Sequence, residues 1–85
     1  MTSFQSGGQA AREAGEAWSA QIAAEVRAEM ARQGKSKGEL AHALGVTLNT
    51  AKSRYDGTHP YDMVELALIA IWLDVDMRDF AKEAS

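Results

Sequence analysis

The stretch 36–57 restricts the fold of this 85-residue chain more than any other part of the sequence. Ser36 is a favourable helix N-cap, and Glu39 follows it at the spacing of a capping box. Gly45 suits a tight turn after the helix that these residues begin, and Thr47 can cap a second short helix directly behind that turn. The stretch therefore predicts two short helices joined by a turn: 37–44 and 48–56.

A longer helix is expected before this stretch, because residues 9–33 are rich in Ala, Glu, Arg and Gln. Gly34 fits its C-terminal end. Gly15 weakens its early part, so the firm helix is expected to begin between Gly15 and Ser19, and residues 1–8 are expected to form a flexible tail. One apolar stripe recurs every four residues along this helix: Trp18, Ile22, Val26 and Met30.

Two further helices are expected after the stretch. Asp62 can cap a very apolar helix over 63–73, and Asp76 can cap a short helix over 77–84. No run of β-branched residues alternates with polar residues, so no strand is expected. The sequence therefore predicts an all-α fold of five helices in a single domain over 9–85.

The net charge of −3 is distributed unevenly along the chain. Residues 27–59 carry six Lys and Arg against three Asp and Glu, whereas residues 1–26 and 60–85 are both acidic. Charges farther apart than a Debye length of about 8 Å are largely screened at physiological salt, so a local basic surface is enough to bind nucleic acid. The acidic flanks are expected to lower non-specific affinity.

Several function classes are disfavoured by the residues that the chain lacks. It has no cysteine, and its two histidines, His42 and His59, are far apart, so no metal site and no cofactor are expected. No nucleophile–base pair or phosphate loop is recognisable, so neither an enzyme nor a small-molecule ligand site is expected. Because the sequence has no bilayer-length apolar run and no signal peptide, a soluble cytoplasmic protein is expected.

The segment 37–55, KGELAHALGVTLNTAKSRY, resembles the helix-turn-helix of the Cro and lambda-repressor-like (XRE-type) family. Ala41 stands where two helices cross closely, Gly45 stands in the turn, and Val46 fills the gap between the helices. The remaining matching positions form the small core of the unit: Leu40, Leu44 and Ala51. The segment LDVDMRDF, over 73–80, is similar to the closing segment of the family's domain.

This resemblance implies a five-helix, lambda-repressor-like DNA-binding domain with the helix-turn-helix at 37–56 and an extended N-terminal helix. It implies a sequence-specific transcriptional regulator that binds double-stranded DNA, of the kind found as bacteriophage Cro proteins and small immunity regulators, which repress by occupying an operator. The helix over 48–56 would then be the recognition helix, lying in the major groove.

Three features depart from the family pattern. Arg54 stands where the family usually has an apolar residue, and the apolar side chain is instead Tyr55. The segment 50–54 looks like the recognition helix of sigma factors. Lys37 stands where the family often has glutamine, so a glutamine that supports the recognition residues is missing.

The recognition helix offers one polar face. Ala51 and Tyr55 are expected to point inward on a helical wheel, which turns Asn49 and Ser53 outward, with Lys52 and Arg54 flanking them. The Asn49 amide matches adenine in a bidentate pair, with a capping role beside Thr47 as the alternative. Leu48 is expected either to touch a thymine methyl group or to turn into the core. The expected base contacts are Asn49, Ser53, Lys52, Thr50 and Leu48.

The expected phosphate contacts lie around the helix-turn-helix. Lys37 begins the first short helix, whose exposed amide groups add a partial positive charge, so it is expected to reach a phosphate. Arg54 is expected either to contact a phosphate or to pair internally with Asp62 or Glu65. His59 is expected to be either a backbone contact or a solvated loop residue. The full set is Lys37, Lys35, Ser36, Thr47, Arg54 and His59.

The helix over 63–73 is apolar on more than one face. Its expected inward residues are Met63, Leu66, Ala67, Ala70 and Leu73, which leaves an apolar outer face: Val64, Leu68, Ile71 and Trp72. Such a face usually marks an interface, so a homodimer is expected, with recognition helices roughly 34 Å apart. The alternative is that the N-terminal extension, with Phe4 and Trp18, covers this face within one molecule.

The competing function is a helical module that engages or inhibits a host protein without binding DNA. The acidic ends and the apolar helix over 63–73 favour it. Salt distinguishes the two, because DNA binding weakens steeply as salt rises and an apolar interface does not.

Overall fold

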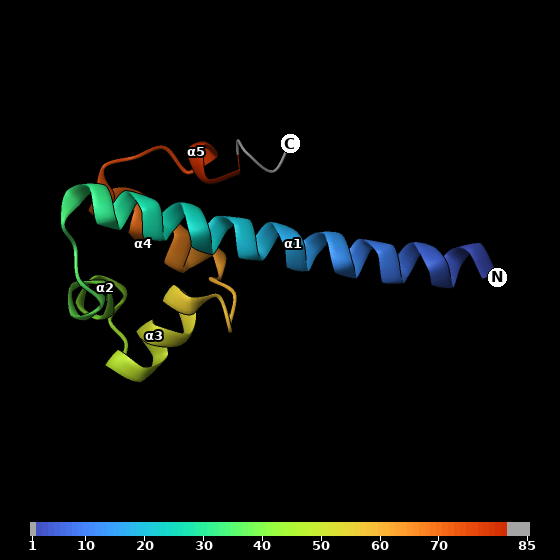
Figure 1. Cartoon of the computed structure of the whole chain (residues 1–85), viewed down its shortest axis with the longest axis horizontal. Coiled ribbons are helices and arrows are strands. Elements are labelled where there is room, and N and C mark those ends of the chain that lie inside the picture. The colour runs from blue at the N-terminus through green and yellow to red at the C-terminus, as the bar shows by residue number, and fades with distance from the viewer. Residues whose placement is uncertain (1, 82–85) are drawn as a thin grey trace.

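A computed structural model describes the backbone of residues 2–81 and the side chains of residues 8–80. Its elements are α1 (Thr2–Gln33), α2 (Lys37–Leu44), α3 (Leu48–Asp56), α4 (Met63–Leu73) and α5 (Arg78–Ala81). No strand occurs among the described residues. The predicted all-α fold of five helices is confirmed (Figure 1).

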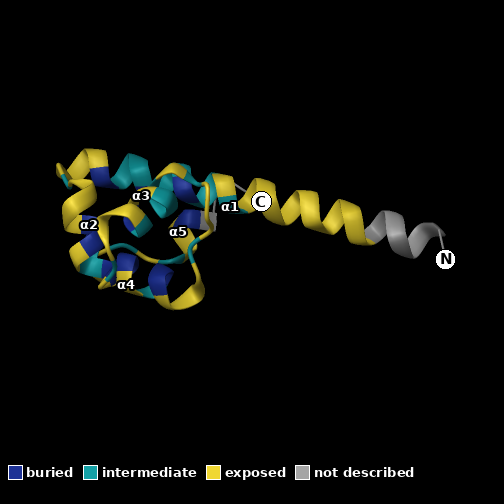
Figure 2. Ribbon diagram, turned by 90° about the horizontal axis from the view of Figure 1, so that it is seen from below, coloured by how far each residue is buried: buried dark blue, intermediate teal, exposed yellow. Residues whose placement is uncertain are grey.

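The first helix is longer than the sequence indicated. Its backbone is helical from Thr2, so the start expected between Gly15 and Ser19 is wrong, and residues 2–8 are helical where a flexible tail was expected. Glycine in a helix interior costs about 1 kcal/mol relative to alanine, which the surrounding Ala, Glu and Arg residues offset. The side chains from Gly8 to Trp18 are all exposed, and Figure 2 shows this part of α1 projecting beyond the other helices.

The two short helices have the predicted caps. The Ser36 Oγ accepts a hydrogen bond from the Glu39 N–H at 3.1 Å, and the Ser36 N–H donates to Glu39 Oε1 at 2.8 Å, which completes the capping box. Gly45 ends α2 at a φ of 68°, in the left-handed region that glycine tolerates. Thr47 caps α3 by accepting a hydrogen bond from the Thr50 N–H.

The core is formed where α1, α2, α4 and α5 meet. The largest fully buried side chains are Met30, Leu40, Ile69, Leu73 and Val26. Val26 and Met30 belong to the stripe predicted on α1, whereas Trp18 at its N-terminal end is 48% exposed. Phe80 of α5 is buried against the same cluster, so α5 closes the core at one side.

α4 buries a different arc from the one expected. Leu66, Ala70 and Leu73 are buried as expected, but Met63 is 71% exposed and the expectation that it points inward is wrong. Ile69, which was not assigned inward, is fully buried. On a helix these two residues lie about 60° to either side of Leu66, so the buried arc is centred toward Ile69 and leaves Met63 outside.

The segment after α4 begins with a residue in a left-handed backbone conformation. Asp74 ends α4 at a φ of 57°, a left-handed conformation more usual for glycine. Asp76 then accepts a hydrogen bond at Oδ1 from the Arg78 N–H at 2.9 Å, as the predicted cap requires. The expected end of this last helix at Ala84 lies outside the described residues. None of the helices described has the length and apolar character needed to cross a membrane.

Candidate nucleic-acid interface

The orientation of α3 is fixed by two of its own side chains. Ala51 is fully buried, and Tyr55 is half-buried against the core, as predicted. The opposite side of α3 therefore faces solvent. Asn49 lies on that side and Lys52 lies at its edge; both are exposed, and their side chains make no hydrogen bond with other described residues. The capping role considered for Asn49 is taken instead by Thr47.

The C-terminal end of α3 is held by cationic side chains from other helices. Arg27 of α1 donates a hydrogen bond from Nη1 to the Tyr55 carbonyl oxygen at 2.8 Å. Its guanidinium carbon lies 6.0 Å from the centroid of the Tyr55 ring, and Lys37 Nζ lies 4.8 Å from the same centroid. A bond to a charged donor satisfies one of the carbonyl groups that a helix end leaves unpaired. The role of Arg27 was not predicted, because no local sequence signal marks a residue that acts 28 positions away.

Arg54 pairs internally with Glu65, which is one of the two roles expected for it. Its Nε lies 3.1 Å from Glu65 Oε1, and the two side chains are only 19% and 9% exposed. The same Glu65 oxygen accepts a hydrogen bond from the Asp62 N–H at 3.0 Å, within the capping box of α4. The Arg54–Glu65 pair links α3 to α4.

The other expected base-contact residues differ in how far they are exposed to solvent. Leu48 is 46% exposed, so it does not turn into the core. Ser53 is half-buried, and its hydroxyl donates to the Asn49 carbonyl oxygen at 3.4 Å. Thr50 is also half-buried and accepts a hydrogen bond from the Thr47 hydroxyl at 3.1 Å. Asn49, Lys52 and Leu48 are therefore the more accessible of the five.

The expected phosphate-contact residues also differ in their exposure and in the contacts that they already make. Lys37 and His59 are exposed, and Lys35 is half-buried with its Nζ 5.8 Å from the centroid of the Trp72 ring. Ser36 is exposed, but it donates its N–H to Glu39 within the capping box, and its hydroxyl interacts with the same carboxylate. Thr47 directs its hydroxyl proton to Thr50 and is committed within α3.

Few cations are left to attract nucleic acid. Arg32 pairs with Glu29 at 2.7 Å, and Arg78 pairs with Asp76 at 2.7 Å. Arg27 and Arg54 are bound internally. The basic character of residues 27–59 therefore resides in a few lysines: Lys35, Lys37 and Lys52.

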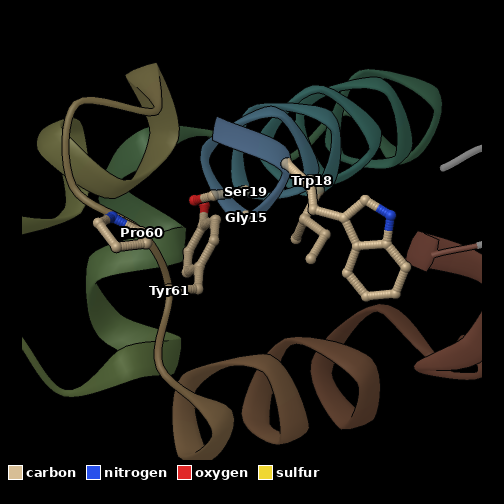
Figure 3. Close-up of a pocket in the computed structure, with 7 residues that line it drawn as sticks. Gly15, Trp18, Ser19, Pro60 and Tyr61 are labelled. Atoms are coloured by element: carbon tan, nitrogen blue, oxygen red, sulfur yellow. The ribbon is translucent and has the colours of Figure 1, made fainter. Parts of the chain in front are cut away.

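A groove separates α1 from the loop after α3. It encloses about 370 Å³, and Figure 3 shows Pro60 and Tyr61 facing Gly15 and Ser19 of α1 across it. The Tyr61 hydroxyl is buried without a hydrogen-bond partner, and burial, with the nearby charge of Glu65, raises its pKa well above the ordinary value. The groove continues along α1 into a hollow that Arg12 and Glu16 line opposite Thr58. No group of acidic or histidine residues in the described part of the chain is arranged to hold a metal ion.

No protein-family model matches this chain, and comparisons with curated proteins and with solved structures find no match.

Proposed function

We propose that this chain is a sequence-specific regulator of transcription that acts in the cytoplasm by placing α3 in the major groove of double-stranded DNA. The observation that carries the proposal is the division of α3 into two sides. One side is held against the domain through Ala51, Tyr55 and Arg54. The other presents Asn49 and Lys52 to solvent without hydrogen bonds to other described residues.

The residues of α3 suit base recognition in this arrangement. The Asn49 amide can form two hydrogen bonds with adenine in one plane. Its N–H donates to N7, and its oxygen accepts from the N6 amino group. Lys52 can donate to guanine or to a phosphate, and the exposed Leu48 can contact a thymine methyl group. Because α3 is anchored at Tyr55 and Arg54, these side chains are presented from a fixed support.

Backbone contacts would come from the start of α2. Lys37 is exposed at the first position of α2 and can donate to a phosphate oxygen. The small number of available lysines and the net charge of −3 imply weak non-specific binding. Discrimination would therefore rest on the base contacts, and repression would follow from blocking polymerase at an occupied operator.

Selection of bound sites from random duplex DNA tests the proposal directly. We expect enrichment of a defined sequence and an affinity that falls steeply as salt rises. No enrichment, with partner binding that is insensitive to salt, would instead support the competing function as a protein-binding module, which the exposed apolar side of α4 favours.

Two matched variants separate base reading from phosphate binding. Asn49→Ala is expected to remove the preference at one base position, at a cost of about 1–3 kcal/mol against the selected site. Lys37→Ala is expected to weaken binding to all sequences alike and to reduce the salt slope by about one. If Asn49→Ala leaves the selected sequence unchanged, α3 does not read DNA through this residue.

A further inference from the structure

The outer face of α4 is apolar and uncovered. Of its eleven residues only Glu65 is polar, and Glu65 is buried in the ion pair with Arg54. The exposed fractions are 69% for Val64, 36% for Leu68 and 78% for Ile71. A helix that is apolar on every side is normally buried on every side, so this face lacks a partner within the described residues.

The part of the N-terminal extension whose side chains are described, from Gly8 onward, does not cover this face. Trp18 lies in an apolar groove with Ile22, Met63, Met77 and Phe80, at the edge of α4 away from its outer face. Val64 and Ile71 stay open beside it, so the expected alternative of an intramolecular cover by Trp18 is wrong; the Phe4 side chain lies outside the described residues. Trp72, which was expected on the face, is half-buried against the core.

We infer that the outer face of α4 is the two-fold interface of a homodimer, with Leu68 at the axis. Val64 and Ile71 lie about one helical turn to either side of Leu68. Antiparallel pairing about that residue therefore seats Val64 of one copy against Ile71 of the other, at both ends of the contact. It also brings the N-terminal end of each helix toward the C-terminal end of its neighbour, which is the favourable arrangement of helix dipoles.

A second copy fits this face better than an unrelated protein, because the face carries no charged or polar side chain. Interfaces of homodimers are the more apolar class, whereas transient interfaces are about as polar as the rest of the surface. The acidic residues near α4, Asp62 and Asp74, stand at its ends rather than on the face. At 11 residues α4 is about 16 Å long, shorter than an interface of about 800 Å² per partner requires, so a reversible dimer is expected.

Pairing through α4 leaves the recognition helix available. α3 packs against α1 and α2, while α4 packs against α1 and α2 from another side (Figures 1 and 2). Two copies would double the few lysines that a single domain offers, and linked binding of two half-sites raises overall affinity. This consequence rests on the proposed function and predicts a palindromic site, whereas the dimer itself does not depend on DNA.

The test is sedimentation equilibrium of the full chain without DNA, over about 5 to 500 µM, the range in which small interfaces dissociate. We expect the mass to rise from 9.2 kDa toward twice that value. Leu68→Glu is expected to remain monomeric with unchanged helix content, because the side chain is partly exposed in the monomer. Leu48→Glu, at a comparably exposed leucine outside the face, is the control and is expected to dimerise normally.

Mixing variants tests the position of the axis. Leu68→Glu and Leu68→Lys place like charges against each other in each separate homodimer, so both are expected to be monomeric alone. An equimolar mixture is expected to form a heterodimer, because the two charges then meet as an opposite pair. A wild-type chain that stays at 9.2 kDa throughout, or a dimer insensitive to Leu68→Glu, would overturn the inference without bearing on DNA binding.

Discussion

Single residues decide how α3 is held. Arg54 stands where the family that the sequence resembles usually has an apolar residue. Its partner Glu65 is the one polar residue of α4. The charged pair links α3 to α4. One Glu65 oxygen accepts hydrogen bonds from both the Arg54 Nε and the Asp62 N–H.

We expect Arg54→Met to destabilise the fold by about 2 kcal/mol, because it leaves the buried Glu65 carboxylate without its counter-ion. Urea unfolding measures this effect. The salt slope of DNA binding should stay unchanged, since Arg54 is engaged internally. Lys52→Met is the matched control on the same helix, with normal stability and weaker DNA binding; a reduced salt slope for Arg54→Met would show that its guanidinium reaches phosphate.

At the scale of elements, the short helices depend on their ends. α2 has only eight residues, too few for a stable isolated helix, so its capping box and its packing maintain it. α1 contributes to other helices in the same way, since Gln33 Nε2 donates to the Leu73 carbonyl oxygen at 2.8 Å and Arg27 bonds the end of α3. Side chains of α1 thus bind the C-terminal ends of both α3 and α4.

The capping box of α2 predicts a pH dependence. Hydrogen bonds from the Ser36 N–H and hydroxyl lower the pKa of Glu39 below its ordinary value of 4.5. A carboxyl with a depressed pKa in the folded state stabilises the fold above its ordinary pKa and loses that contribution as the pH falls through the folded value. Wild type should therefore lose stability relative to Glu39→Gln below pH 4.5, as measured by thermal unfolding across pH.

Ser36→Ala is the companion variant and should cost about 1 kcal/mol at neutral pH through the lost cap. If Glu39→Gln follows the wild-type pH profile in parallel, the capping box contributes nothing through ionisation. Glu29, whose pKa is also lowered by hydrogen bonds from Arg32 and Gln33, provides a second site for comparison through Glu29→Gln.

At the scale of the whole molecule, the fold divides into a packed domain and a projecting helix. The molecule measures 48 × 25 × 18 Å, and its long axis follows α1 (Figure 1). The core begins near Ala23 and Val26, whereas the side chains before Trp18 are exposed. The projecting part therefore adds no buried apolar surface to the described core.

Deleting residues 2–13 should change the free energy of unfolding by no more than about 0.5 kcal/mol, because residues 8–13 are exposed and bury little apolar surface. Circular dichroism should show the loss of helix, while the urea midpoint stays near that of the full chain. Trp18→Ala is the contrasting variant, since Trp18 lines the groove against Met63 and Phe80. A large drop in stability on deletion would mean that this part of α1 contacts the domain.

The sequence predicted the elements that depend on local chemistry. Caps at Ser36, Thr47 and Asp62 act on backbone groups two or three residues away, so the bounds of α2, α3 and α4 could be foreseen. The orientation of α3 also followed from the spacing of Ala51 and Tyr55. The start of α1 was missed, because a glycine was given more weight than the helix-forming residues around it.

By itself, then, the sequence determined five helices, their caps and the face that α3 turns to solvent, since these follow from propensity and periodicity within a few residues. Only the tertiary structure decided the partner of Arg54, the use of Arg27 and Gln33 at distant helix ends, and the burial of Ile69 in place of Met63. Those outcomes depend on how helices far apart in sequence meet. The solvent-facing side of α3 can be predicted from its own residues, but the side chains that support α3 come from helices distant in the sequence.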